Sequence, residues 1–157
     1  MKLRRDSKID LLRSVPLFAE CSQKELGRIA AIADELYQPE GTRLIEEGKK
    51  GREFFVLVDG TVDVRRNGRK LRTMGTGDFF GEIALITDSP RSATVTATSP
   101  VRVLVITSQA FQRLLADTAT LQPKVLAALA ERAARTLPYR HLGLEVETTN
   151  LNPRGSG

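Results

Sequence analysis

The spacing of apolar residues predicts helices at both ends of the chain and strands between them. Ile9, Leu11 and Leu12 give residues 8–13 one apolar face, and the sequence Val-Pro-Leu-Phe at 15–18 ends this first helix. Ser22 and Glu25 form a capping-box pattern at the start of a second helix, which we expect to run to about residue 35. Its apolar positions recur at helical spacing: Leu26, Ile29, Ala30, Ala33 and Leu36. We therefore place the N-terminal helices within residues 8–36.

Between residues 37 and 107 the pattern changes to short apolar runs separated by turn residues. We expect strands at 42–46, 54–58, 61–65, 69–74, 93–97 and 101–106. The pair Asn67-Gly68 is a strong signal for a hairpin turn between two of these strands. Many short strands at even spacing, interrupted by glycine, are typical of an antiparallel barrel or jelly roll.

Two more helices are expected after the strands, within residues 108–137. Ser108 is the expected cap of the first, and the second begins near Gln122 or Pro123 and ends before Pro138. The fold class is therefore α+β, mainly β: an antiparallel β-roll or jelly roll of about eight strands with N-terminal helices and C-terminal lid helices. We expect one domain over 1–140 and a polar, flexible tail over 141–157.

Composition narrows the class of protein. The 157 residues suit one domain with a modest core, built from Val, Leu, Ile and Ala because aromatic residues make up only 5% and Trp is absent. Cys21 is the only cysteine, so no internal disulfide is expected, and His141 is the only histidine, so neither a metal site nor a cofactor is expected. The sequence contains no apolar run long enough for a membrane span and no apolar signal core, and we expect a cytoplasmic protein.

The net charge of +5 permits binding to anions, but the cations are spread over the chain. One group lies at the N-terminus and the other in the central hairpin: Lys2, Arg4, Arg5, Lys8, Arg13, and Arg65, Arg66, Arg69, Lys70, Arg72. We interpret both groups as solvated faces rather than DNA contacts, and we expect no DNA-binding module.

The most informative segment is residues 80–94, Phe-Gly-Glu-Ile-Ala-Leu-Ile-Thr-Asp-Ser-Pro-Arg-Ser-Ala-Thr, called the cassette below. Gly81 lets backbone approach a ligand closely, and residues 82–85 can form one helical turn whose N–H groups suit a phosphate. Arg91 can bind two phosphate oxygens with its planar guanidinium, while Glu82 accepts hydrogen bonds and suits a sugar hydroxyl. The simpler interpretation is a surface loop with an ordinary Glu82–Arg91 ion pair.

The cassette resembles the phosphate-binding cassette of the cyclic nucleotide-binding domain family, which includes kinase regulatory subunits, catabolite-activator-like regulators and gated channels. The match lies at Phe80, Gly81, Glu82, Ile83, Ala84, Leu85, Arg91, Ser92 and Ala93, and the order of elements extends it over roughly residues 9–137. The resemblance implies that Glu82 holds the ribose 2′-hydroxyl and Arg91 the cyclic phosphate. It also implies that N–H groups near Gly81, Ile83 and Ala84 complete the site. The ligand-binding set is thus Phe80, Gly81, Glu82, Ile83, Ala84, Arg91, Ser92 and Ala93.

The resemblance further implies a sensor, not an enzyme, in which the ligand repositions the C-terminal helices. Arg132 and Arg135 are the candidates for capping the base, and Leu137 and Tyr139 are further candidates for this role. We expect cAMP as the ligand. The alternative is cGMP, because Ser92 occupies a position where some cGMP-preferring members carry Thr. With one cassette and no membrane span, the chain looks like a stand-alone module with an effector protein in trans, and a homodimer is compatible with it.

Three alternatives belong to other classes. One is a protein-interaction domain of the same fold without a physiological nucleotide, which the intact Glu82 and Arg91 disfavour. The second is a cupin-like enzyme, which would need several histidines in the strand region. The third is a truncated DNA-binding regulator, which a salt-dependent gel shift would reveal.

Overall fold

The computed structural model describes residues 3–85, 88–128 and 130–131. Two helices and a short 3₁₀ turn come first: α1 (Arg5–Arg13), η1 (Pro16–Phe18) and α2 (Gln23–Ala31). The predicted capping box is confirmed, since the Ser22 hydroxyl accepts from the Glu25 amide and the Glu25 carboxylate accepts from the Ser22 amide. The predicted end of this helix is wrong. The helix stops at Ala31, and Leu36 belongs to a strand, where it is 40% exposed.

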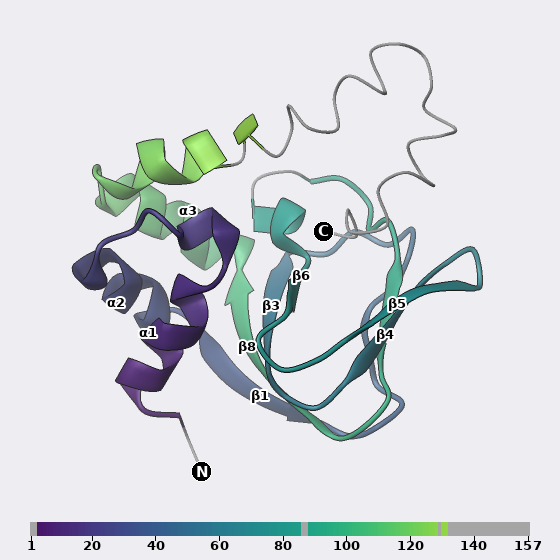
Figure 1. Ribbon diagram of the computed structural model, residues 1–157. Helices are drawn as coiled ribbons and strands as arrows, with labels where there is room; N and C mark the ends of the chain where they lie inside the picture. The colour runs from purple at the N-terminus through teal and green to yellow at the C-terminus, as the bar shows by residue number, and fades with distance from the viewer. Residues whose placement is uncertain (1–2, 86–87, 129, 132–157) are drawn as a thin grey trace.

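Eight strands follow in two antiparallel sheets, as the sequence predicts (Figure 1). The first sheet has the order β1-β8-β3-β6: β1 (Asp34–Gln38), β8 (Val101–Thr107), β3 (Glu53–Asp59) and β6 (Phe79–Phe80). The second has the order β2-β7-β4-β5: β2 (Arg43–Ile45), β7 (Thr94–Ala97), β4 (Val62–Arg66) and β5 (Arg69–Met74). The Asn67-Gly68 hairpin is confirmed, because β4 and β5 pair antiparallel around it and both turn residues have positive φ.

The remaining elements are helical. The 3₁₀ turn η2 (Glu82–Leu85) confirms the expected turn within the cassette. Helix α3 (Ser108–Asp117) begins where predicted, but its N-cap is Thr107, whose hydroxyl accepts from the Ala110 amide, rather than Ser108. A further helix covers residues 121–128 and 130–131.

Two cores lie on the two faces of the first sheet. One fills the space between the sheets and includes Leu57, Val64 and Val103. The other joins the outer face of the first sheet to the helices through Phe18, Phe54 and Phe111. Figure 1 shows the consequence, with the helices gathered on one side of the roll and the β4–β5 hairpin on the opposite side.

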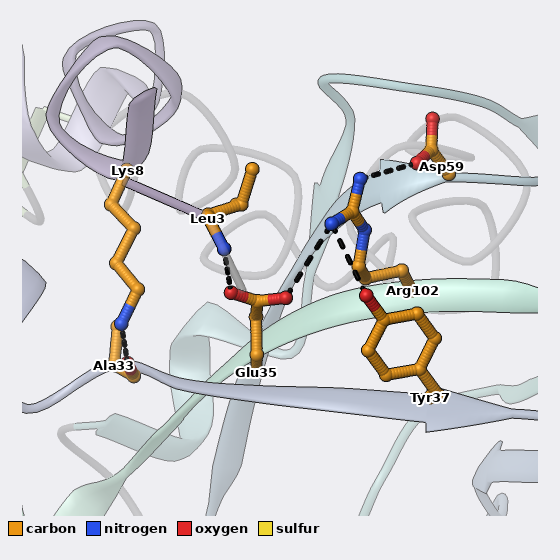
Figure 2. Close-up of polar contacts among 7 residues, drawn as sticks. All are labelled: Leu3, Lys8, Ala33, Glu35, Tyr37, Asp59 and Arg102. Carbon is orange, nitrogen blue, oxygen red and sulfur yellow. Dashed lines mark hydrogen bonds and ion pairs between the residues drawn. The ribbon is translucent and has the colours of Figure 1, made fainter. Parts of the chain in front are cut away.

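Polar contacts tie the N-terminal helices to the first sheet (Figure 2). Lys8 donates to the Ala33 carbonyl over 2.7 Å, and the Leu3 amide donates to the Glu35 carboxylate. Arg102 joins neighbouring strands, because its guanidinium bonds the Asp59 carboxylate at 2.8 Å and lies 3.5 Å from that of Glu35. The guanidinium also donates to the hydroxyl of Tyr37, so the strand edge and the helices form one connected unit.

Candidate ligand-binding site

The cassette leaves the first sheet through a sharp turn at Gly81. This residue has φ +82°, a conformation that glycine adopts without a Cβ penalty. A Cβ at this position would lie 2.9 Å from the Glu53 carbonyl oxygen and 3.0 Å from Nη1 of Arg91. Glycine is therefore required here by both backbone conformation and space, and the turn brings η2 directly onto β3.

Arg91 is buried beneath this turn, with 6% of its surface exposed. Its Nη2 donates to the Glu53 carbonyl over 2.7 Å and lies 3.7 Å from the Glu53 carboxylate, while Nη1 is 3.4 Å from the Gly81 carbonyl. Burial lowers the pKa of Arg91, and the Glu53 carboxylate opposes that effect. Because the ordinary pKa of arginine lies far above neutral pH, the guanidinium stays charged. It is therefore a largely desolvated cation inside the protein.

The backbone around Arg91 is held as firmly as its side chain. The Gly48 amide donates to the Arg91 carbonyl over 2.8 Å, and the Arg91 amide donates to the Lys49 carbonyl over 2.9 Å. A Cβ at Gly51 would lie 2.6 Å from Cζ of Arg91, so this glycine leaves room for the guanidinium. The loop between β2 and β3 thus fixes where Arg91 points.

Three other predicted site residues are buried: Glu82, Phe80 and Ala93. Glu82 is 2% exposed, so the simpler interpretation of a surface ion pair with Arg91 is wrong for both partners. Phe80 belongs to the core between the sheets, where it stacks on Phe55 with ring centroids 5.0 Å apart, and Ala93 is fully buried in the same core. These two residues support the cassette from the inside.

Backbone groups of two further predicted residues, Ala84 and Ser92, take part in hydrogen bonds within the protein. The Ala84 amide donates to the Gly81 carbonyl over 3.1 Å and closes the helical turn, so this amide is already engaged within the cassette. Ser92 is half-buried, and its carbonyl accepts a hydrogen bond from Arg66. The side chain of Ile83 and the proposed caps Arg132, Arg135, Leu137 and Tyr139 lie outside the described part of the structure.

Sequence reasoning missed Glu53, because its contact with Arg91 joins residues 38 positions apart. It also misplaced Arg72, which we expected on a solvated face. Arg72 pairs with Val64 across β4 and β5, and directly opposed residues share a face of the sheet. Since Val64 is fully buried between the sheets, the half-buried Arg72 lies on the inner face of the roll. A strict alternation count would have found this, had the bulge after Val64 been visible.

A contact links the cassette to the C-terminal helices. Gln112 of α3 donates to the carbonyl of Leu85, the last residue of η2, over 2.6 Å. Leu85 itself is fully buried and shares the helical core with Phe111 and Leu115 of α3. A shift of the cassette turn would therefore displace α3, because the two are joined by a hydrogen bond and by apolar packing.

Two features are absent from the part of the chain that the structure describes. Within residues 3–85, 88–128 and 130–131, no helix is long and apolar enough to cross a membrane. In the same part of the chain, no group of three or more His, Cys, Asp or Glu residues is arranged to hold a metal ion.

Known proteins resemble both the sequence and the fold. The regulatory subunit of the cAMP-dependent protein kinase from Colletotrichum orbiculare is 40% identical over 115 residues, which are 71% of this chain and 29% of that protein. The cGMP-dependent protein kinase isozyme 1 of Drosophila melanogaster is 35% identical over 129 residues, covering 77% of this chain and 17% of that protein. The chain thus spans less than a third of the length of these curated relatives.

Solved structures give the same result. The N-terminal domain of a transcriptional regulator from Streptomyces coelicolor A3(2) superposes with a TM-score of 0.74 at 30% identity, covering 81% of this chain and 94% of that one. The regulatory domain of Toxoplasma gondii PKA, co-crystallised with cAMP, superposes with a TM-score of 0.69 at 25% identity, covering 84% and 50%. The sequence model of the cyclic nucleotide-binding domain matches residues 35–118, which include the whole cassette. This chain therefore belongs to the cyclic nucleotide-binding domain family.

Proposed function

We propose that this protein is a cyclic nucleotide sensor that binds its ligand at the cassette and signals through its C-terminal helices. The observation that carries the proposal is the buried, charged Arg91 held beneath the Gly81 turn. Burying a cation costs free energy unless an anion compensates it. The contact between Arg91 and the Glu53 carboxylate, at 3.7 Å, is long for a charge-assisted hydrogen bond. A ligand phosphate would therefore compensate the charge of Arg91 further.

The roles implied by the family complete the site. Arg91 takes the cyclic phosphate, Glu82 takes the ribose 2′-hydroxyl, and amides of the Gly81–Ala84 turn add donors. Because the Ala84 amide already closes the turn, we assign most of the backbone contribution to its neighbours. Phe80 and Ala93 act by supporting the cassette, and Ser92 borders the phosphate. We propose a binding protein rather than an enzyme, with no metal at the site, because the family to which the chain belongs is defined by cyclic nucleotide binding.

For the base we retain cAMP as the expected ligand, which the cAMP-dependent kinase relatives support. Arg72 favours cGMP as the second candidate. It lies on the inner face of the roll, and an arginine can donate to both O6 and N7 of guanine, whereas adenine presents an amino group at the position of O6. Competition of cAMP and cGMP for the wild-type protein and for Arg72→Ser decides between them. A cGMP preference lost in the variant would assign the base contact to Arg72.

Signalling requires that the ligand bind two conformations with different affinity. We propose that nucleotide binding moves η2, and that the Gln112–Leu85 contact passes this movement to α3 and the following helix. Arg132 or Arg135 would then cap the base. The domain would comprise residues 1–140 with a tail at 141–157, and the signal would pass to an effector protein in trans or a second copy in the cytoplasm.

A thermal-shift series tests the proposal. Saturating cAMP or cGMP should raise the melting temperature, because ligand at a hundredfold excess over Kd stabilises a fold by about 2.7 kcal/mol. The acyclic 5′-AMP and 5′-GMP serve as controls for phosphate binding of any kind. No shift with either cyclic nucleotide, in folded protein free of carried-over ligand, would favour an interaction domain without a nucleotide. A salt-sensitive gel shift with DNA would favour the regulator alternative.

A further inference from the structure

The cation Arg66, at the end of β4, contacts the cassette. Its Nε donates a hydrogen bond of 3.0 Å to the carbonyl of Ser92, the residue that directly follows Arg91. Arg66 and Ser92 are 26 positions apart in the sequence, and the contact is partly buried. The central hairpin, which the sequence presents as a solvated group of cations, therefore touches the proposed ligand site.

The tip of the hairpin is fixed by a second set of contacts. The Asn67 amide donates to the Glu47 carboxylate over 2.9 Å, and the Glu47 amide donates to the Thr94 hydroxyl over 3.0 Å. Glu47 lies in the loop that also binds the backbone of Arg91. The turn beside Arg66 is thus anchored through Glu47 to Thr94, which lies two residues after the Ser92 that Arg66 contacts.

The orientation of one peptide follows from this contact. In a planar trans peptide the carbonyl and the N–H of the next residue point in opposite directions. Since the Ser92 carbonyl is turned toward Arg66, the Ala93 N–H points away from the hairpin. Ala93 is fully buried in the core between the sheets and follows Arg91 by two residues, so the bond from Arg66 fixes a peptide next to the cassette arginine.

We propose that Arg66 is a positioning residue for ligand binding. It holds the Ser92–Ala93 peptide so that the Ala93 amide is presented to the anionic part of the ligand beside Arg91. The inference rests on the proposed function, and it adds to it a control point on the β4–β5 hairpin. Arg66 itself does not touch the ligand, so its effect is on geometry rather than on charge at the site.

The neighbouring Arg65 provides a matched control. It is an arginine on the same strand with about half of its side chain exposed, and its contacts are with Asp63 at 3.8 Å and the Gly68 carbonyl at 3.3 Å. Removing Arg65 takes one positive charge from the same hairpin without removing the bond to the cassette. General attraction of an anionic ligand by the hairpin would therefore respond equally to both substitutions.

The test compares Arg66→Gln, Arg65→Gln and Arg66→Lys by calorimetric titration with cAMP and cGMP. We expect Arg66→Gln to weaken binding roughly tenfold, the effect of one lost hydrogen bond to a charged group, and Arg65→Gln by less than about twofold. Arg66→Lys should recover part of the loss. In ¹H–¹⁵N spectra, the ligand-induced shift of the Ala93 amide should shrink in Arg66→Gln and persist in Arg65→Gln.

The outcomes separate this inference from the proposed function. If the wild-type protein binds neither nucleotide, the sensor function fails and the inference fails with it. If the wild type binds and the two glutamine variants bind alike, or if the Ala93 amide shift is unchanged in Arg66→Gln, only the positioning role is overturned. Should Arg66→Gln not fold, Glu47→Ala removes the acceptor that holds the hairpin tip, and unchanged affinity in that variant overturns the role as well.

Discussion

Gln112 of α3 donates a hydrogen bond of 2.6 Å to the carbonyl of Leu85, the last residue of the cassette turn. The bond joins the segment that carries the proposed ligand site to the helices that would carry the signal. Leu85 also belongs to the helical core that contains Phe111 and Leu115. The cassette turn, which carries the proposed ligand site, and helix α3 are therefore connected at Leu85.

The substitution Gln112→Leu should uncouple the two parts while leaving the ligand contacts intact. We expect nucleotide affinity to change by less than about threefold, because Gln112 bonds the carbonyl of Leu85, which lies outside the proposed ligand-binding set. Ligand-induced changes in hydrogen–deuterium exchange across residues 108–131 should become smaller. Gln109→Leu, an exposed glutamine on the same helix, is the control. Full transmission in Gln112→Leu would remove this bond from the mechanism.

A second prediction concerns the contacts that anchor the helix at residues 121–128. The buried Glu25 carboxylate accepts from Lys124 over 2.7 Å and from the Thr120 hydroxyl over 2.6 Å, besides the capping bond to Ser22. The hydrogen bond from Lys124 is the largest cause that lowers the pKa of Glu25, to about 2. Replacing Glu25 by Gln should cost about 1–3 kcal/mol at pH 7, because bonding partners of the carboxylate lose its charge.

The pH dependence of that loss has a definite sign. A carboxylate whose pKa is lowered on folding stabilises the protein above its unfolded pKa, near 4.5, and this contribution disappears as pH falls toward 2. Urea unfolding should therefore show a wild-type advantage over Glu25→Gln that is complete at pH 6–7 and shrinks below pH 4.5. Glu20→Gln, at an exposed neighbouring carboxylate, should show little of it. A difference independent of pH would contradict the assignment.

The space beside Arg91 gives a third prediction. A methyl group at Gly51 would lie 2.6 Å from Cζ of Arg91, and the buried guanidinium has little room to yield. Gly51→Ala should displace it and weaken nucleotide binding at least about tenfold, since a desolvated charge pair depends strongly on geometry. Gly75→Ala is the matched control, because a Cβ there meets nothing within 4 Å. Equal affinities of the two variants would show that Arg91 does not need its observed position.

The single cysteine gives a fourth prediction. Cys21 is buried, and burial is the main cause that raises the pKa of its thiol to about 11, with the nearby Glu25 carboxylate adding to the effect. Only the thiolate reacts readily with alkylating reagents, so the folded protein should react slowly with iodoacetamide at pH 8 and rapidly in urea. Fast labelling of the folded protein would show that the segment around Cys21 opens easily.

Local signals in the sequence were reliable because the physics behind them is local. The Ser22–Glu25 capping box and the Asn67-Gly68 turn each depend on residues within one turn of chain, and both occur as predicted. The cassette was recognised for the same reason, since Gly81 to Leu85 form their turn from adjacent residues. The arrangement of strands followed from their spacing and from the glycines between them.

The errors arose where distant segments decide the local structure. Leu36 continues the helical spacing of the second helix, yet pairing with Val103 of β8 makes it part of a strand. Counting pairs from the Asn67-Gly68 turn would set Arg72 opposite Asp63, but the bulge after Val64 brings Arg72 opposite Val64 and so onto the inner face. Glu53 could not be linked to Arg91 from the sequence, because a strand residue gives no sign of which distant side chain it contacts.

The most direct test of the central claim is a calorimetric titration of the wild-type protein, Arg91→Ala and Arg52→Ala with cAMP and with cGMP. Arg52 is an exposed arginine directly before β3, and its substitution controls for the loss of one positive charge. We predict saturable binding to the wild type and to Arg52→Ala, and a loss of roughly a hundredfold or more in Arg91→Ala. Binding by Arg91→Ala with wild-type affinity, or no binding of either nucleotide by folded, ligand-free wild-type protein, would contradict the account.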